Sequence, residues 1–469
     1  MRSTPLAALL VAAALAAGCG GADAARSTGP TASGAAATAK PAAPGAHSAR
    51  ARAAAAGDPW DHLRALAAVG ARSRGTRAAG TPGGVATEDL IAGRLRAIGW
   101  SVRFEPVPFP FFAERRRPVV TLPGGRALRP GADVRTLTYS PGGTASAPLQ
   151  RVGGNRADAG CRAADWNGFA RGRIALVRRG TCPFAAKARR AQNAGAAAVI
   201  VVDAAARGDR GPVRGTLGAP GIRVPVLAVD ADGGAALDAA RGRAVRVRVD
   251  AVSERRTARN VIAELPGRDR SARVVMAGAH LDSVPDGPGV NDDGSGVAAL
   301  IAIAGRLAAG PRPPATVRLG FWTAEELGLY GSRHYVRTLD RAERRRLRSY
   351  VNLDMVASPN AVLETYGAGA TEAALRRALD ARGPTPSRSS IGGASDHASF
   401  QRAGVEVGGV FTGASERVRP GPARRFGADA GRPADPCYHR ACDTLANANR
   451  RMLDRVTDAT EAAVRQLAR

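Results

Sequence analysis

The sequence is poor in lysine, in aromatic residues and in cysteine. Only two of its 68 basic residues, Lys40 and Lys187, are lysine, and aromatic residues make up 4% of the chain. Surfaces that bind nucleic acids interleave basic with aromatic side chains, whereas the arginine runs 115–117 and 344–346 contain no aromatic residue. We therefore attribute the formal net charge of +28 to a composition rich in arginine, alanine and glycine, and expect no nucleic-acid partner.

The five cysteines divide into two pairs and one remaining residue. The pairs are Cys161 with Cys182 and Cys437 with Cys442, and Cys19 remains. Disulfides are typical of proteins exported from the cytoplasm, so we expect both pairs to be bonded. A zinc–thiolate site is the alternative, but the two pairs lie far apart in the sequence and lack CxxC spacing.

The apolar run near the N-terminus is too short to span a bilayer. Residues 1–19 hold one arginine, this apolar run and small residues before Cys19, which is typical of a secretory signal. The segment LAAGC resembles the bacterial lipoprotein box, so we predict a lipid anchor at Cys19, with a plain cleaved signal as the alternative. Residues 20–57 contain almost no large apolar residue and are predicted to be a disordered tether. The protein is thus expected to be extracytoplasmic and to meet the membrane only through its lipid.

The rest of the chain is longer than one ordinary core covers, which suggests two domains. Residues 58–118 show two helical patterns and a strand, and residues 253–469 show longer alternation of strands and helices. Such alternation predicts an α/β fold with a mixed, mostly parallel sheet between helices. Residues 119–252, which we call the middle unit, contain short apolar strand patterns around one helix and are predicted to be a mainly β insertion.

Acids and histidines follow several of the predicted strands. They are His280, Asp292, Glu325, Glu326 and Asp354, and His439 lies in the loop 437–442. In open α/β sheets, ligand sites gather at the carboxyl ends of the strands, so we expect these side chains to meet. Histidine mixed with carboxylate suits zinc, and a carboxylate that can bridge favours two ions roughly 3.5–4 Å apart.

Neighbouring residues leaving a strand point to opposite sides, so Glu325 and Glu326 are predicted to divide into a base and a metal ligand. Asp282, two residues beyond His280, is placed to accept the ring N–H of that histidine and fix its tautomer. Taken singly, each feature has an ordinary explanation, because acidic pairs are usually solvated and NDDGSG would serve as a turn with a helix cap. Together, at consecutive strand ends, they predict a metal site.

Seven segments in order resemble the M28 family of zinc aminopeptidases, most closely the secreted actinobacterial leucine-type aminopeptidases. These segments are AGAHLDSV, GVNDDGSGVAAL, AEELGLYGS, NLDMV, SDHASF, GGVFTGA and CYHRACDTL. The middle unit, with GCRAADW, GRIALVRRGTCPFAAKARRAQNAGAAAVIVVD and VPVLAVD, resembles the protease-associated (PA) domain inserted in many members, and Cys161 and Cys182 occupy its disulfide positions. The resemblance implies the zinc-exopeptidase fold and removal of N-terminal residues from peptides.

The resemblance also implies the metal ligands. Asp292 would bridge two zinc ions, His280 and Asp354 would complete one site, and Glu326 and His439 would complete the other.

For catalysis, the resemblance implies that Glu325 is the general base and that the hydroxyl of Tyr438 stabilises the oxyanion. A disulfide between Cys437 and Cys442 would then hold Tyr438 and the neighbouring zinc-binding imidazole in one rigid ring, which removes reorganisation from the reaction. The family pattern also implies that the peptide between Asp292 and Asp293 is cis.

Similarity to the leucine-preferring members places Met355 and Phe411 in the wall of a pocket for a large apolar side chain. One departure concerns Ala394, which stands where these relatives carry arginine before SDH. Contacts of that arginine to substrate or product are therefore absent here.

Asp454 and Asp458, an i, i+4 pair on the last predicted helix, match acids that bind calcium near the N-terminal segment of a close relative, and Asp58 is a candidate further ligand. An ordinary acidic helix face is the alternative explanation for these residues.

Two further functions fit the same fold. One is a carboxypeptidase or a glutaminyl-cyclase-like enzyme, the latter with one zinc. The other is a catalytically inactive binding module, against which the complete set of ligands with Glu325 and Tyr438 argues. We expect a monomer that acts on peptides.

Overall fold

The computed structural model describes residues 57–203, 211–269 and 273–469. The predicted signal, the lipid-anchor residue Cys19 and all of the predicted tether except Gly57 lie outside these residues. Within the described part of the chain, the helices are all too short or too polar to cross a membrane.

The described chain begins with two capped helices, α2 (Pro59–Arg72) and α3 (Pro82–Ala97). Each starts with proline, whose missing N–H costs nothing at the first helical position. The side chain of Asp58 accepts a hydrogen bond from the Trp60 backbone and that of Thr81 accepts one from Gly84, as N-cap residues do. These caps explain why both helices begin slightly before the apolar patterns that predicted them.

Parallel strands form the centre of the main sheet. Across the sheet they are β13 (Glu406–Phe411), β10 (Leu347–Leu353), β8 (Val274–His280) and β9 (Thr316–Trp322). Every residue of β8 and β9 is buried, which is typical of parallel strands covered on both faces. Antiparallel neighbours flank them: β11 (Glu364–Gly367), which pairs with β12 (Ser387–Arg388), and β7 (Ala244–Leu265). The predicted mixed, mostly parallel sheet is confirmed.

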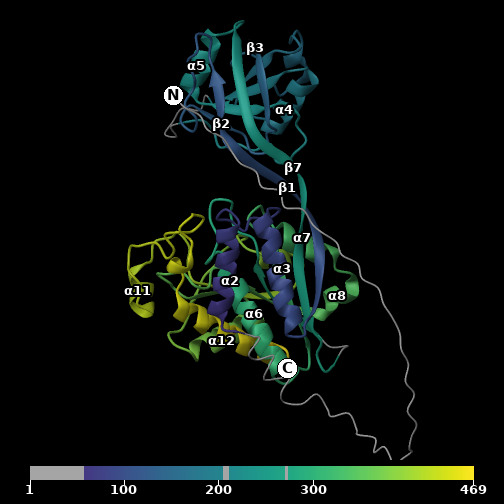
Figure 1. Ribbon diagram of the computed structural model, residues 1–469, viewed down its shortest axis with the longest axis vertical. Helices are drawn as coiled ribbons and strands as arrows, with labels where there is room; N and C mark the ends of the chain where they lie inside the picture. The colour runs from purple at the N-terminus through teal and green to yellow at the C-terminus, as the bar shows by residue number, and fades with distance from the viewer. Residues whose placement is uncertain (1–56, 204–210, 270–272) are drawn as a thin grey trace, which may run out of the picture. The chain divides into compact units, whose positions relative to one another are not determined.

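Helices cover both faces of this sheet (Figure 1). One face packs on α2, α3, α6 (Gly294–Ala309), α9 (Gly369–Asp380) and α12 (Arg450–Leu467), with Val275 and Ala277 of β8 in that core. The alternate residue Met276 joins a second core with Tyr335 of α7 (Tyr330–Thr338) and Phe400 of α10 (His397–Arg402). The shorter elements α8 (Arg341–Arg346), α11 (Pro420–Phe426) and η2 (Leu445–Asn447) lie in the connections.

The middle unit has its own sheet. Parallel strands β3 (Gly143–Arg151), β4 (Ile174–Arg178), β5 (Ala198–Val202) and β6 (Val226–Val229) follow one another, and β2 (Val134–Thr136) is antiparallel to β6. Short helices accompany them: η1 (Ala163–Trp166), α4 (Phe184–Asn193) and α5 (Ala231–Ala239). Separate apolar clusters form on this sheet, so the unit has its own core.

The two sheets are continuous through β7, which pairs with β9 of the main sheet and with β3 of the middle unit. Strand β1 (Ser101–Thr121) pairs with β7 from Ser101 opposite Glu264 to Thr121 opposite Arg246. The predicted domain boundaries at 118/119 and 252/253 therefore fall inside continuous strands. The sequence did not reveal this continuity, because residues 253–257 of β7 lack buried apolar side chains although their backbone pairs with β1.

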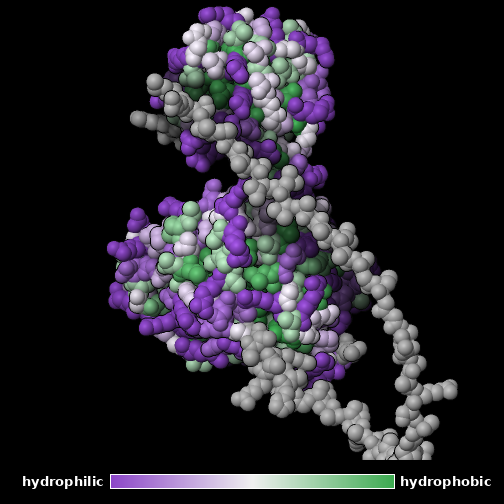
Figure 2. All heavy atoms as spheres, viewed as in Figure 1, coloured by the Kyte–Doolittle hydropathy of each residue, from purple (hydrophilic) through white to green (hydrophobic). Residues whose placement is uncertain are grey.

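Both predicted disulfides are present. Cys161 is bonded to Cys182 and Cys437 to Cys442. Hydrophilic side chains cover most of the visible surface in Figure 2, as the arginine-rich composition leads one to expect, and apolar ones gather over α2 and α3.

Candidate metal centre

The predicted residues meet at one edge of the main sheet. His280 is the last residue of β8, Glu325 and Glu326 follow β9, and Asp354 follows β10. Because these three strands are parallel neighbours, their carboxyl ends lie side by side. Asp292 comes just before α6 and completes the group with His439 from the disulfide loop.

Asp292 lies between two histidines. Its Oδ1 is 3.1 Å from His280 Nε2, and its Oδ2 is 3.1 Å from His439 Nε2. Asp354 Oδ1 lies 3.6 Å from His280 Nε2, while Glu326 Oε2 lies 3.1 Å from His439 Nε2. The structure thus brings the five predicted ligands into two sets that share Asp292.

The donor set fits a metal ion. One ligand atom each from His280, Asp292 and Glu326 lies within 4.8 Å of the others. Among the described residues, the buried Oε1 of Glu326 has no hydrogen-bond partner. Burial raises the pKa of Glu326 to about 7, and the charge of Asp292 adds to that rise. Buried carboxylates without a compensating cation are costly, and mixed imidazole and carboxylate donors favour zinc.

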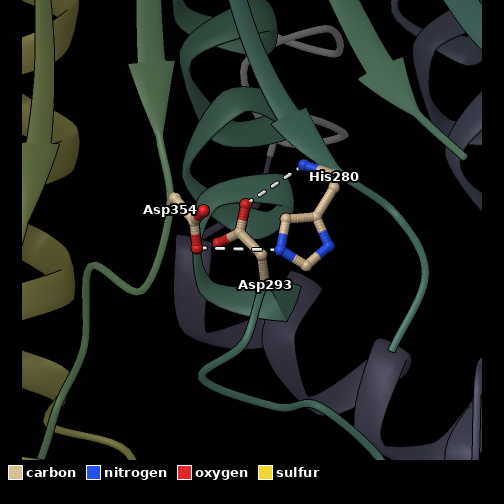
Figure 3. A group of neighbouring side chains, drawn as sticks. All are labelled: His280, Asp293 and Asp354. Carbon is tan, nitrogen blue, oxygen red and sulfur yellow. Dashed lines mark hydrogen bonds and ion pairs between the residues drawn. The ribbon is translucent and has the colours of Figure 1, made fainter. Parts of the chain in front are cut away.

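A second grouping includes Asp293, to which the sequence analysis gave no role. Figure 3 shows His280, Asp293 and Asp354 close together. Asp293 Oδ2 accepts a hydrogen bond from the His280 backbone N–H at 3.2 Å. Its Oδ1 accepts from Gly296 at 2.9 Å and from Met355 at 3.2 Å. Since its oxygens already bind these backbone groups, Asp293 holds together the ends of β8, α6 and β10.

Asp293 is the N-cap of α6, and the peptide before it is cis, as the family resemblance implied. The helix-cap explanation of NDDGSG therefore holds for Asp293, and Asp292 stays the predicted metal ligand. The sequence offered two adjacent acids and no means of separating their contacts.

Asp282 differs from the prediction in the atom that it uses. His280 Nδ1 lies 3.1 Å from the backbone carbonyl oxygen of Asp282 and 3.9 Å from the carboxylate. The carbonyl is therefore the nearer acceptor that fixes the tautomer of His280. The Asp282 carboxylate instead accepts from the Glu325 backbone N–H at 3.1 Å. Burial raises the pKa of Asp282 to about 6, against the opposing charge of His280.

Glu325 is 9% exposed and lies beside the ligand sets. Burial raises its pKa well above the ordinary value, His280 opposes the rise, and the nearby Asp396 and Asp354 add to it. A carboxylate whose pKa is raised above its ordinary value holds a proton more readily, which suits it to taking up and returning one.

The disulfide loop presents two aromatic rings to the site. The rings of Tyr438 and His439 stack with centroids 3.8 Å apart, and His439 has a left-handed backbone with φ of 58°. The Cys437 N–H donates to Asp435 Oδ1 at 2.8 Å, which fixes the start of the loop. Tyr438 and His439 both line the cavity beside Glu325.

A buried polar network ties this loop to Asp292. The Asp443 carboxylate accepts from the backbone N–H groups of Asn291 at 2.8 Å and Asp292 at 3.1 Å. Asn291 Nδ2 donates to Asp435 Oδ2 at 2.7 Å. Asn291 and Asp443 stand inside the motifs that carried the resemblance, but the sequence analysis gave them no role.

The cavity has an apolar wall on one side of the metal ligands. It measures about 170 Å³, and Met355 and Phe411 line it as predicted, together with Ile391, Ala394 and Ala414. The methyl group of Ala394 extends this apolar wall where related enzymes were expected to place an arginine.

The acids considered for calcium are paired with arginines. Arg450 Nη2 lies 2.6 Å from Asp58 Oδ2, and its Nε lies 3.9 Å from Asp454. Arg306 Nη1 lies 2.7 Å from Asp458 Oδ1. These guanidinium groups already neutralise the acids, which favours the alternative of an ordinary charged helix face.

Arg77, between α2 and α3, is buried behind the centre. Its guanidinium donates to the backbone carbonyls of Leu281, Pro288 at 2.9 Å and Gly289 at 2.6 Å. These carbonyls belong to the loop that connects His280 to Asp292. The sequence gave no sign of this role, because Arg77 is one of 68 basic residues and follows no pattern.

Replacing Arg77 with methionine is expected to lower the free energy of unfolding by about 3–5 kcal/mol, because buried carbonyls lose their donor. The amount of zinc bound per chain should also fall, because the loop that Arg77 holds carries the proposed ligands His280 and Asp292 at its two ends. Urea unfolding and metal analysis measure both effects, and the exposed Arg72→Met is the matched control. Unchanged stability in Arg77→Met would contradict this role.

Comparison with known proteins agrees with the geometry. The peptidase family M28 matches residues 260–464, and the PA domain matches residues 145–237. The probable lipoprotein aminopeptidase LpqL of Mycobacterium tuberculosis is 37% identical over 84% of this chain and 81% of that protein. An aminopeptidase of Pseudomonas aeruginosa is 35% identical over 85% of this chain and 78% of that protein.

Among solved structures, BSAP, a zinc aminopeptidase from Bacillus subtilis, superposes with a TM-score of 0.61 at 25% identity. The match covers 90% of this chain and 95% of that one. The fold and the site therefore define a zinc-dependent aminopeptidase, a metallopeptidase among the hydrolases. The chain belongs to peptidase family M28 and carries an inserted PA domain. Its predicted domain boundaries remain predictions.

Proposed function

We propose that this protein is a di-zinc aminopeptidase that removes large apolar residues from the N-termini of peptides outside the cytoplasm. The observation that carries the proposal is the position of Asp292, whose two oxygens each lie 3.1 Å from a different histidine. One acid on each side, Asp354 or Glu326, completes a ligand set.

Zinc ions bound there would supply Lewis acidity that polarises the scissile carbonyl and acidifies a bound water. Glu325 takes the proton of the attacking water and returns it to the leaving amine. The Tyr438 hydroxyl donates a hydrogen bond to the oxyanion. Burial and nearby acids raise the pKa of Tyr438, so that its hydroxyl keeps its proton at neutral pH.

Two features of the cavity support the choice of substrate. The carboxylates around the ligand sets favour the α-ammonium group of a free N-terminus, which restricts cleavage to the first residue. The apolar wall of Met355, Phe411 and Ile391 then receives the side chain of that residue.

Three observations support a lipid-anchored location outside the cytoplasm. The chain carries two disulfides, which are typical of exported proteins. One relative is named a lipoprotein aminopeptidase. Residues 1–19, outside the described part, have the composition of a signal that ends at Cys19.

The proposal is tested with the full-length protein on leucine, lysine and alanine p-nitroanilides, beside a direct measurement of zinc per chain. We expect two zinc ions, fastest release with leucine, loss of release with a chelator and recovery on adding zinc. One zinc per chain with turnover of N-terminal glutamine substrates would instead support a cyclase. A folded protein with two zinc ions and no release from any of the three substrates would refute the aminopeptidase assignment.

A further inference from the structure

A buried lysine contacts the disulfide of the PA domain. Lys187 lies on α4, and its side chain is 0% exposed. Its ammonium group donates to the Ala159 carbonyl and to Cys161 Sγ, with the nitrogen 3.5 Å from the sulfur. Almost all other basic residues of the chain are arginine, which holds its proton under all ordinary conditions, whereas a buried lysine can release one. The aminopeptidase reaction makes no use of this contact.

The Lys187 ammonium has no carboxylate partner within the described part of the chain. The acids that influence its charge are Asp158 and Asp165, and both form ion pairs with Arg156. Burial lowers the pKa of Lys187, and these two acids oppose that shift. A buried cation without a counter-ion is costly, and a negative charge on the sulfur of Cys161 would remove that cost.

The two sulfurs of the disulfide differ in their surroundings. Cys161 Sγ accepts from Lys187 and lies 3.9 Å from the Thr181 hydroxyl, which is the donor in that contact because a disulfide sulfur carries no hydrogen. Among the residues that the structure describes, none donates a hydrogen bond to Cys182 Sγ. When a thiol splits a disulfide, the sulfur whose thiolate is better stabilised leaves more readily. The surroundings therefore favour Cys161 as the leaving sulfur.

The loops that carry the two cysteines are held together by contacts that involve no sulfur. Thr181 N–H donates to the Ala157 carbonyl at 3.1 Å. A Cβ added at Gly180 would come within 1.5 Å of the same carbonyl oxygen, so the two backbones are in close contact there. The bond from Lys187 to Ala159 fixes the first loop to α4. These contacts remain when the disulfide is reduced, so the two thiols stay close enough to form it again.

We propose that Cys161–Cys182 is a reversible exchange site for small-molecule thiols, in which Cys182 is the attacked sulfur and Cys161 the leaving sulfur. The thiolate of the small thiol attacks Cys182 Sγ, the S–S bond breaks, and its electron pair leaves on Cys161 beside the Lys187 ammonium. A second thiolate then attacks the small thiol's sulfur in the mixed disulfide and frees Cys182. Two small thiols are thus oxidised to one small disulfide while the protein disulfide is reduced to two thiols.

The first test uses the unmodified full-length protein with glutathione as the thiol. Brief exposure is followed by acid quenching, blocking of free thiols and peptide mapping by mass spectrometry. We expect glutathione on Cys182 and a free thiol at Cys161. Glutathione found mainly on Cys161 would overturn the proposal.

The same protein, once reduced, provides a second measurement. The rate of alkylation by iodoacetamide is followed against pH for each cysteine, because only the thiolate reacts. We expect the half-point for Cys161 to lie about one pH unit or more below that for Cys182. A Cys161 half-point equal to or above that of Cys182 would contradict stabilisation of its thiolate by Lys187.

Replacing Lys187 with methionine keeps a long unbranched side chain and removes the ammonium group. We expect reduction of Cys161–Cys182 by glutathione to slow about tenfold, because the leaving thiolate loses its counter-ion. The disulfide Cys437–Cys442 in the same molecule is the internal reference, since within the described chain neither of its sulfurs accepts a hydrogen bond. Its rate of reduction should be unchanged.

Arg162→Met is the matched control for Lys187→Met. Arg162 is adjacent to Cys161 in the sequence, but its exposed guanidinium pairs with Asp158 at 2.7 Å and not with the sulfur. Its replacement should leave the rate of reduction at the wild-type value. An unchanged or faster rate in Lys187→Met, or an equal slowing in Arg162→Met, would refute the role of the ammonium. If Lys187→Met does not fold, the two measurements on the unmodified protein decide. All of these readouts are independent of peptide hydrolysis.

Discussion

Replacing Glu325 with glutamine is expected to lower kcat for leucine p-nitroanilide by about 10³-fold while the two zinc ions that we propose stay bound. The amide keeps the size of the side chain but cannot take up a proton. Glu325 contributes no atom to the two ligand sets, which consist of His280, Asp292 and Asp354 on one side and Asp292, Glu326 and His439 on the other. Metal binding should therefore survive the change.

The neighbouring residue supplies the control. Glu326→Gln is expected to lose one zinc ion per chain, because its carboxylate lies 3.1 Å from His439 within a ligand set. Steady-state kinetics with metal analysis separates the two glutamates. If Glu325→Gln kept near-normal kcat, or if both variants lost zinc equally, the division into a base and a ligand would be wrong.

Removing zinc should make stability depend strongly on pH. In the metal-free protein, burial raises the pKa of Glu326 to about 7. The contribution of protonated Glu326 to the free energy of unfolding is therefore fully present below its unfolded-state pKa of about 4.3 and is lost as pH rises through 7. Nearby Asp292 and Glu326 raise the pKa of His439 to about 10 although its burial opposes this. The contribution of protonated His439 to the free energy of unfolding is present below its unfolded-state pKa of about 6.5 and is lost as pH rises toward 10.

Both contributions have the same sign, so the Tm of the metal-free protein should fall between pH 5 and pH 8.5. The pKa of Asp292 is lowered, and its contribution changes only below this window. Zinc binds the deprotonated forms of its ligands, so the Tm of the zinc-loaded protein should rise over the same pH range. At a free zinc concentration a thousandfold above Kd, it adds about 4 kcal/mol to the free energy of unfolding.

Scanning calorimetry of metal-free and zinc-loaded protein at several pH values measures this difference. Glu326→Gln is the control and should show a shallower dependence when metal-free. A metal-free protein that grew more stable between pH 5 and pH 8.5 would contradict the charge arrangement of the site.

Sequence reasoning predicted that the proposed metal ligands lie together, because parallel strands bring their carboxyl ends to one edge. His280, Glu326 and Asp354 could be assigned to that edge from strand patterns alone. The acceptor of the His280 ring N–H could not be predicted. The choice between the carbonyl and the carboxylate of Asp282 depends on how the chain turns after β8.

Residues that act through buried backbone contacts left no pattern. Arg77 binds three carbonyls from more than 200 positions away in the sequence, and nothing distinguishes it from the exposed arginines. The calcium acids show the opposite case, because their i, i+4 spacing was visible but the arginines that pair with them were not. Distant partners of this kind are decided by tertiary packing.

The ladder between β1 and β7 has a consequence for protein engineering. The chain leaves the main sheet along β1 and returns along β7, and Ala113 stands directly opposite Val252. The chain therefore leaves and re-enters the main sheet at two residues that pair directly with each other. A two-residue Asn-Gly turn joining Ala113 to Val252 would close the ladder as an ordinary hairpin. We therefore expect that the insertion can be removed between these two paired residues, with the strands that support the metal centre remaining paired as before.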